Sequence, residues 1–172
     1  LDSVTIPGAS VINDRLDDKT IEIGLDIHGE AGMRQIQLKS ADELAKEILI
    51  TIRDFGLLVK DANGGKGVVP TFQKGDNVAL LINNLGGTSN FEMMILANSV
   101  VSLLESDGDG MGCHVTRLYV GSYMTSFGMH GASVTVLNLE KIGGAKKYLD
   151  AQCTSPAWSA SEVWEEPGKF RA

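Results

Sequence analysis

Cysteine is scarce in this chain: Cys113 and Cys153 are the only two among 172 residues, and they lie in unrelated contexts. Neither belongs to a run of Cys and His at metal-ligand spacing, so the sequence argues against a zinc site and against a disulfide framework. No metal ligands are therefore expected in this chain. Few and unpaired thiols are typical of a reducing compartment, and we expect a cytoplasmic protein.

Long apolar runs and an excess of basic residues are also missing. An uninterrupted run such as Val78–Ile82 is far shorter than the roughly 20 apolar residues that span a bilayer. The 15 Lys and Arg residues are outnumbered by 22 Asp and Glu residues, which gives a net charge of −7. Nucleic acids and anionic membranes would repel such a chain, so we expect neither as a partner and favour a small ligand.

The rest of the composition is that of an ordinary globular protein. Hydrophobic residues make up 43% of the chain, and 172 residues are enough for one domain with a full core. Residue 1 is leucine and not methionine, so we expect the chain to begin inside a longer polypeptide. Residues 159–172 are polar and contain Pro167, and we interpret them as a polar tail or the start of a linker.

A strand with a histidine at its end is the first candidate for a site. Ile21–Ile27 alternates apolar and polar residues, which predicts a strand with one apolar face. Asp26 and His28 fall on the other face, because side chains two residues apart point the same way. His28 is followed by the turn-forming run Gly29–Gly32, so its imidazole is expected at the rim of a sheet. That position suits a nucleophile, a base or a metal ligand, although a lone histidine there is more often structural.

The run Gly24–Gly32 resembles the glycine, isoleucine, histidine, glycine, glutamate signature of the dihydroxyacetone kinase family. Asp26 stands where that family usually has glycine, and Ala31 where it often has proline. Further segments resemble successive parts of the family's substrate-binding module in the same order: Ile6–Gly8, Val78–Thr88, Gly121–Ser126 and Met129–Thr135. Ordered matches over most of a chain are more specific than one short motif.

The resemblance implies an α/β fold: a single domain with a mixed β-sheet flanked by helices, of the K-module type. It implies that residues 1–158 are the second, C-terminal lobe of that module. His28 would be the catalytic residue, holding dihydroxyacetone or glyceraldehyde as a covalent hemiaminal. It would bind the substrate together with Asp26, Gly29 and Glu30. An ionised Asp26 beside it would favour the protonated imidazole, which is not a nucleophile.

The resemblance also implies phosphoryl transfer to a terminal hydroxyl of the substrate. This chain shows no nucleotide motif, so ATP and magnesium are expected on a separate helical module. The first lobe of the binding module is likewise expected outside residues 1–172. The fragment alone is then expected to be inactive, and the complete kinase to be a homodimer. Two alternatives stay open: a non-catalytic carbonyl- or lipid-binding relative of the same fold, and a dimerisation lobe.

Caps and periodicity predict the main elements. Ser40 and Glu43 predict a capping box for a helix that runs to about Gly56. Strands are predicted at Val78–Ile82, Val115–Val120 and Ser133–Leu139, and a short helix at Ile142–Leu149. The side chains expected to point inward from the first helix are Leu44, Ile48, Ile52 and Phe55.

The turn Asn83–Thr88 joins the buried strand to a second helix, capped by Ser89 and Glu92. Free N–H groups at a helix start can hold an anion, but a tight connecting turn is the favoured interpretation. His130, in a later loop, is interpreted as structural, and Trp158 as packing back onto the domain. The second helix is predicted to bury Phe91, Met94, Ile95, Ala97, Val101 and Leu104.

Overall fold

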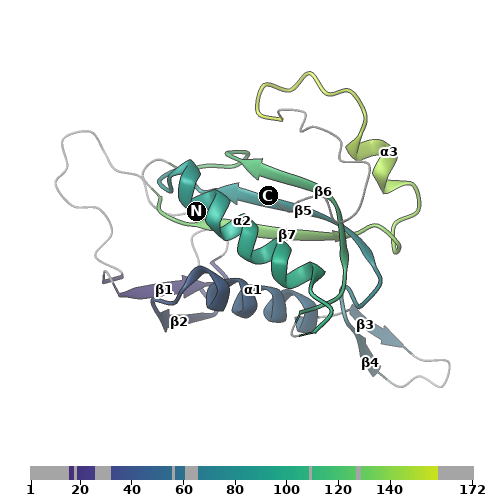
Figure 1. The fold of residues 1–172 in the computed structure, drawn as a ribbon, viewed down its shortest axis with the longest axis horizontal. Coiled ribbons are helices and arrows are strands. Elements are labelled where there is room, and N and C mark those ends of the chain that lie inside the picture. The colour runs from purple at the N-terminus through teal and green to yellow at the C-terminus, as the bar shows by residue number, and fades with distance from the viewer. Residues whose placement is uncertain are drawn as a thin grey trace.

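The computed structural model describes residues 16–17, 19–25, 32–55, 57–60, 66–108, 110–126 and 129–158. It confirms an α/β domain with a mixed sheet flanked by helices (Figure 1). The elements of the described part are, in chain order, β1 (Thr20–Ile23), β2 (Arg34–Gln37), α1 (Ala41–Phe55), β3 (Leu57–Lys60), β4 (Lys66–Val69), β5 (Asn77–Asn84), α2 (Asn90–Glu105), β6 (His114–Gly121), β7 (Ala132–Asn138) and α3 (Ala145–Leu149).

The main sheet has three described strands in the order β6-β5-β7, with β5 parallel to β6 and antiparallel to β7. Helix α2 is the crossover between the two parallel strands, as a parallel pair requires. The central strand β5 buries Val78, Leu80 and Ile82 completely. The predicted central strand is therefore confirmed, and so are the strands predicted from Val115 and from Ser133.

A β-bulge changes which side chains of β6 face the helices. Val78 of β5 pairs with Val115, but its neighbour Ala79 pairs with Arg117, so Thr116 is an extra residue in β6. Val115 consequently packs in the core with the helices. Arg117 is directed to the opposite face of the sheet, where it is nevertheless buried.

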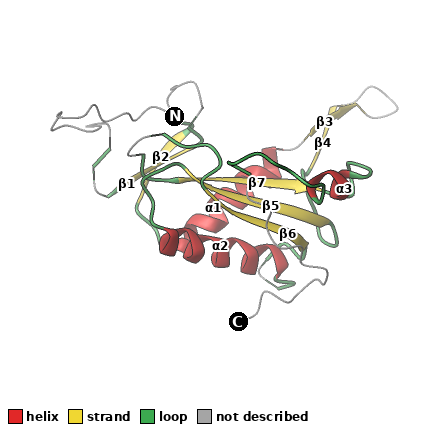
Figure 2. Ribbon diagram, turned by 90° about the horizontal axis from the view of Figure 1, so that it is seen from above, coloured by secondary structure: helices red, strands yellow, loops and turns green. Residues whose placement is uncertain are grey.

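Helix α2 covers one face of the sheet, and α1 packs against α2 (Figures 1 and 2). The predicted capping box of α1 is present: the Ser40 N–H donates to Glu43 Oε2 at 3.1 Å and the Glu43 N–H donates to Ser40 Oγ at 3.4 Å. The prediction that Phe55 points into the core is wrong, because this side chain at the end of the helix is 81% exposed. The fully buried side chains of the shared core include Ala45, Leu49, Phe72, Val100, Leu104 and Val115.

The predicted inward face of α2 is wrong at three positions. Phe91, Met94 and Ile95 are 75%, 56% and 43% exposed. Apolar residues occur nearly all round this helix, so their spacing does not single out one face. The side chains that α2 buries are Met93, Leu96, Ala97, Ser99, Val100, Val101 and Leu104, three of which were predicted.

The chain after β7 packs onto the face of the sheet that α2 leaves open. Arg117 donates to Asp150 through Nε and Nη2, at 2.6 Å and 2.7 Å, and thereby lowers the pKa of Asp150. The ring of Trp158 lies 5.0 Å from that of Tyr119 and 5.2 Å from that of Tyr123, measured between centroids. The prediction that Trp158 packs back is confirmed. The short helix α3 begins at Ala145, whereas it was predicted to begin at Ile142.

Two antiparallel hairpins complete the described fold. One pairs β1 with β2 and the other pairs β3 with β4, and the second was not predicted from the sequence. No helix in the described part of the chain is long and apolar enough to cross a membrane.

Candidate functional site

The loop between β1 and β2 contains the predicted site. Asp26, His28, Gly29 and Glu30 lie within residues 26–31, outside the described residues, so their placement stays a prediction. The structure describes both ends of the loop. Ile23, the last residue of β1, pairs with Arg34, the first residue of β2. The loop therefore leaves and re-enters the fold at the same end of one hairpin.

Gly24 ends the strand. Its φ of 78° lies in the left-handed region, and a Cβ at this position would lie 2.7 Å from Met33 Cγ. Any other residue would be strained there and would also meet the Met33 side chain. The prediction of one strand over Ile21–Ile27 is therefore wrong at Gly24 and Leu25, which lie outside β1. Asp26 and Ile27, the last two residues of the predicted strand, lie outside the described residues.

Glu22 closes the loop at its other end. The Gly32 N–H donates to Glu22 Oε1 at 2.8 Å, and a Cβ at Gly32 would overlap with the Glu22 side chain. One carboxylate on β1 thus fixes the point at which the loop returns to β2. Sequence reasoning did not single out Glu22, because alternation marks it only as an outward residue of a strand. The available signal was its place just before a segment bounded by two glycines.

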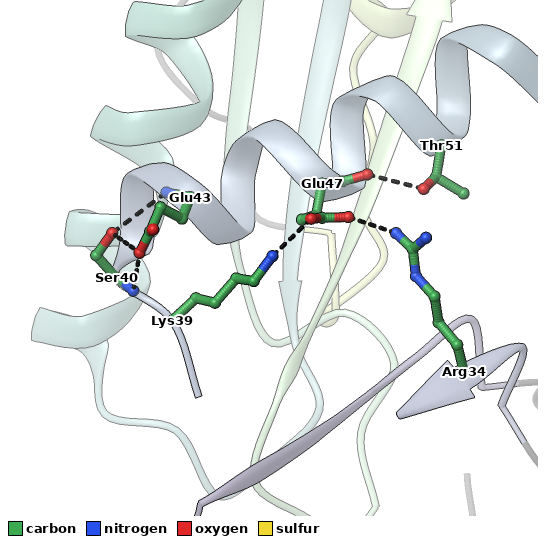
Figure 3. A network of polar contacts seen from close by, with 6 residues as sticks. All are labelled: Arg34, Lys39, Ser40, Glu43, Glu47 and Thr51. Carbon is green, nitrogen blue, oxygen red and sulfur yellow. Dashed lines mark hydrogen bonds and ion pairs between the residues drawn. The ribbon is translucent and has the colours of Figure 1, made fainter. Parts of the chain in front are cut away.

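Two ion pairs attach β2 and the segment that follows it to α1 (Figure 3). Glu47 accepts from Arg34 Nη2 at 2.5 Å and from Lys39 Nζ at 2.6 Å. The hydrogen bond from Lys39, the charge of Lys39 and then the charge of Arg34 lower the pKa of Glu47. Because these side chains are partly exposed, solvent screens both pairs and they add little to stability. Their effect is mainly to orient β2 on the helix.

The turn between β5 and α2 was the second candidate, as an anion site. Its backbone donors are already used within the protein. The N–H groups of Gly86 and Thr88 donate to Asn84 Oδ1 at 2.8 Å and 3.3 Å, and that of Gly87 donates to the Met129 carbonyl at 2.7 Å. The Ser89 N–H donates to Glu92 Oε2 at 3.0 Å, which completes the predicted capping box. These contacts support the favoured interpretation, a tight connecting turn.

Asn83, at the end of β5, holds the loop after β6. Its Oδ1 accepts from the N–H groups of Tyr123 and Met124 at 2.8 Å and 2.9 Å, and its Nδ2 donates to the Met124 carbonyl at 2.8 Å and to Ser133 Oγ at 3.3 Å. Only 2% of Asn83 is exposed. A buried amide with all these partners fixes loop positions far away in the sequence. Sequence reasoning missed this role.

The turn between β5 and α2 also forms hydrogen bonds with the segment that precedes β7. Thr88 Oγ1 accepts from the Gly131 N–H at 2.8 Å and donates to the Gly131 carbonyl at 3.0 Å. Gly86 has a φ of 133°, and a Cβ there would overlap with the carbonyl oxygen of Ser126. Residues 83–88, 121–126 and 129–131 thus form one hydrogen-bonded unit, which we call the loop cluster.

His130 is a further polar residue in the loop cluster. His130 is exposed and is the last of four influences on the pKa of Glu92, which is lowered chiefly by the hydrogen bond with the Ser89 hydroxyl. The structural interpretation of His130 stays a prediction. Among those residues, no three His, Cys, Asp or Glu side chains are grouped so that they could hold a metal ion.

Comparisons with known proteins agree on one family. The family model described as the Dak1 domain matches residues 1–157. The triokinase/FMN cyclase of Bos taurus is 34% identical over 165 residues, which cover 95% of this chain and 26% of that protein. The dihydroxyacetone kinase of Pichia angusta is 32% identical over 179 residues, covering 96% and 28%. The dihydroxyacetone-binding subunit DhaK of the PTS-dependent dihydroxyacetone kinase 1 of Listeria innocua is 33% identical over 140 residues, covering 81% and 37%.

Two solved structures share the fold. A chain described under regulation of the DHA operon of Lactococcus lactis superposes with a TM-score of 0.63 and 29% identity, over 81% of this chain and 38% of its own length. The dihydroxyacetone kinase operon co-activator Dha-DhaQ gives a TM-score of 0.64 and 27% identity, over 87% and 40%. The chain therefore spans about a quarter of the length of the two kinases and less than half of each solved chain.

Proposed function

Because the chain belongs to the Dak1 domain family, we propose that it is the substrate-binding part of a dihydroxyacetone kinase or triokinase. More narrowly, residues 1–158 are proposed to be the second lobe of the binding module, with residues 159–172 leading away from it. The observation that carries the proposal is the match over residues 1–157 to one family whose named relatives include dihydroxyacetone kinases and a dihydroxyacetone-binding subunit.

In this proposal His28 binds the substrate by a covalent bond. A neutral imidazole nitrogen adds to the carbonyl carbon of dihydroxyacetone or glyceraldehyde, and the carbonyl π electrons move to the oxygen. The ring N–H proton is lost and the oxygen gains one, so the product is a neutral hemiaminal and the step is reversible. Glycerol has no carbonyl carbon and cannot form this bond. Asp26, Gly29 and Glu30 are proposed to line the same site.

The described stem of the loop is suited to this role. Gly24 and Gly32 stand where no side chain fits, and the Gly32 N–H is held by Glu22. Both ends of the motif are thus fixed on adjacent strands, and β2 is attached to α1 by the ion pair of Arg34 with Glu47. A loop with fixed ends loses less conformational freedom when it binds a ligand.

Phosphoryl transfer is proposed to need parts outside this chain. The turn before α2 is a helix start of the kind that binds phosphates, but its N–H groups donate to Asn84, Met129 and Glu92. These N–H groups are thus not free for a phosphate, which supports our proposal that ATP and magnesium bind to a separate module. The isolated chain is accordingly proposed to be inactive, and the complete kinase to act as a homodimer.

The proposal is tested by native mass spectrometry of the full-length protein after incubation with dihydroxyacetone. The wild type is expected to gain the mass of one dihydroxyacetone and to gain nothing from glycerol. His28→Ala is expected to lose the adduct, whereas the matched variant His130→Ala keeps it. An equally abundant adduct in His28→Ala would contradict the role of His28.

A further inference from the structure

The outward face of α2 has an unusual chemistry for a surface helix. Between its two ends, where Glu92 and Glu105 lie, the helix contains no charged residue. Phe91, Met94 and Ile95 form an apolar patch on its outward side, which we call the α2 patch. Further along the same side, the exposed residues Asn98 and Ser102 are polar but uncharged. Residues at these spacings lie on one side of a helix.

Helix α1 shows what a solvated face looks like in the same domain. Its exposed positions include Asp42, Glu43, Lys46 and Asp54, and both signs of charge occur along the helix. A helix that is apolar on nearly all sides is typical of one buried on all sides. In Figures 1 and 2, no described helix or strand lies over the outward side of α2. The α2 patch is therefore suited to burial against something outside the described residues.

Building on the proposed function, we propose that the α2 patch is the surface on which the remaining part of the dihydroxyacetone-binding module docks. The binding subunit of Listeria innocua is matched over only 37% of its length, so most of such a subunit lies outside a domain like this one. That remainder has to pack against this domain if the two form one binding unit. Interfaces that stay buried permanently are richer in apolar area and poorer in charge than transient ones, and the α2 patch has that composition.

A second copy of this chain fits the α2 patch less well. If two α2 helices paired antiparallel about a two-fold axis, the apolar half around Phe91 would face the polar half around Ser102. If they paired in parallel, both helix N-termini and both Glu92 side chains would lie side by side, and their like charges would repel. The larger apolar surface of another lobe avoids both conflicts.

The α2 patch also adjoins the loop cluster. Phe91 follows Ser89 and Asn90 at the start of α2, and the turn before Ser89 is bonded to the segments 121–126 and 129–131. A lobe that docks on the patch would therefore be seated beside these loops. The placement makes the patch a positioning surface for the whole module.

Photo-cross-linking in the full-length protein tests this proposal. Phe91→benzoylphenylalanine keeps an aromatic ring at an exposed site and is expected to cross-link to a peptide outside residues 1–172 of the same polypeptide. Lys46→benzoylphenylalanine, on the charged face of α1, is the matched control and is expected to lack that product. Peptide mass spectrometry identifies the product, and gel electrophoresis separates it from cross-linked dimers.

Every other cross-linking result overturns the proposal. A cross-linked dimer at position 91 would assign the patch to a second copy, and a product with a separate nucleotide-binding subunit would assign it to that partner. No product, or the same product from position 46, would mean that the patch is not this interface. The dihydroxyacetone adduct is measured in the same samples. Loss of the adduct with the position 91 product retained would refute the His28 mechanism alone, and the reverse result would refute the interface alone.

Discussion

The two glycine-rich loops of this chain are held in opposite ways. The turn between β5 and α2 has its N–H groups bonded within the protein and is surrounded by the loops at 121–126 and 129–131. The loop between β1 and β2 is held in the described part at its ends, by one strand pair and the bond from Gly32 to Glu22. Both loops follow a strand and contain two or more glycines. The comparison teaches that glycines after a strand do not predict a ligand site until the partners of the backbone donors are known.

The largest effect is expected inside the β5–α2 turn. Gly86→Ala would combine a φ of 133° with overlap on the Ser126 carbonyl oxygen. We expect a loss of about 3 to 4 kcal/mol in the free energy of unfolding, from backbone strain and overpacking together. Gly75→Ala is the matched control, because Gly75 has a φ of 88° but no atom within 4 Å of an added Cβ.

Gly75→Ala should lose only the free energy of backbone strain, about 1 to 2 kcal/mol. Denaturant unfolding of both variants measures the difference. Equal losses would mean that Ser126 does not pack against the turn.

Removing the amide that organises the loop cluster is expected to have the next largest effect. Asn83→Ala would leave the N–H groups of Tyr123 and Met124 without their buried acceptor. We expect a loss of about 2 to 3 kcal/mol together with faster proteolysis near residue 124. Asn98→Ala, at an exposed position on α2, should change stability by about 0.5 kcal/mol or less. If both variants unfolded alike, the loop cluster would not be a unit.

In the β1–β2 loop the effect should fall on binding more than on stability. Glu22→Ala removes the acceptor of the Gly32 N–H, and losing one hydrogen bond of about 1 kcal/mol corresponds to about fivefold weaker retention of dihydroxyacetone. Glu22→Gln keeps an acceptor oxygen and should retain most of the binding. Gln35→Ala, directly across the hairpin, is the control. Equal binding by Glu22→Ala and wild type, measured by titration calorimetry, would show that the end of the loop need not be fixed.

The smallest effect is expected in the pH dependence of stability at the β5–α2 turn. Hydrogen bonds with the Ser89 hydroxyl and then the Ser89 N–H hold the pKa of Glu92 below its ordinary value of 4.5. A carboxylate with a lowered pKa in the folded state stabilises the fold above its unfolded pKa, and this contribution is lost as the pH falls through the folded pKa. Glu92→Gln should therefore be slightly less stable than wild type at pH 7, and the difference should shrink below pH 4.5.

Ser89→Ala should show the same pH dependence, and the double variant should show little more than either single variant. Thermal unfolding at several pH values measures all three. A difference that stays constant across the whole pH range would mean that the capping box does not depend on the charge of Glu92.

Much of the central fold could be predicted from the sequence. The apolar run from Val78 to Ile82 is long enough for a buried strand and too short for a helix, and Ser89 with Glu92 marks the start of α2. The orientation of α2 could not be predicted, because a helix that is apolar all round has no periodic signal. The β3–β4 hairpin was missed, since Lys66 and Gly67 look like part of a turn and yet belong to a strand.

Less of the candidate site could be predicted from the sequence. His28 could be singled out from its motif, but the early end of β1 depends on the backbone angle of Gly24 and on its contact with Met33. The role of Asn83 could not be predicted, because its partners Tyr123 and Met124 follow some 40 residues later in the chain. Contacts of this kind depend on the sheet order, which the local sequence does not determine.

Direct detection of the bond between His28 and the substrate tests the central claim. The full-length protein is prepared with nitrogen-labelled histidine and mixed with dihydroxyacetone that carries a carbon label at its carbonyl. By NMR, the wild type is predicted to show a tetrahedral carbon with one-bond coupling to a ring nitrogen, and His28→Ala is predicted to show only the free ketone and its hydrate. Bound dihydroxyacetone without this coupling in the wild type, or the same coupling in His28→Ala, would contradict the account.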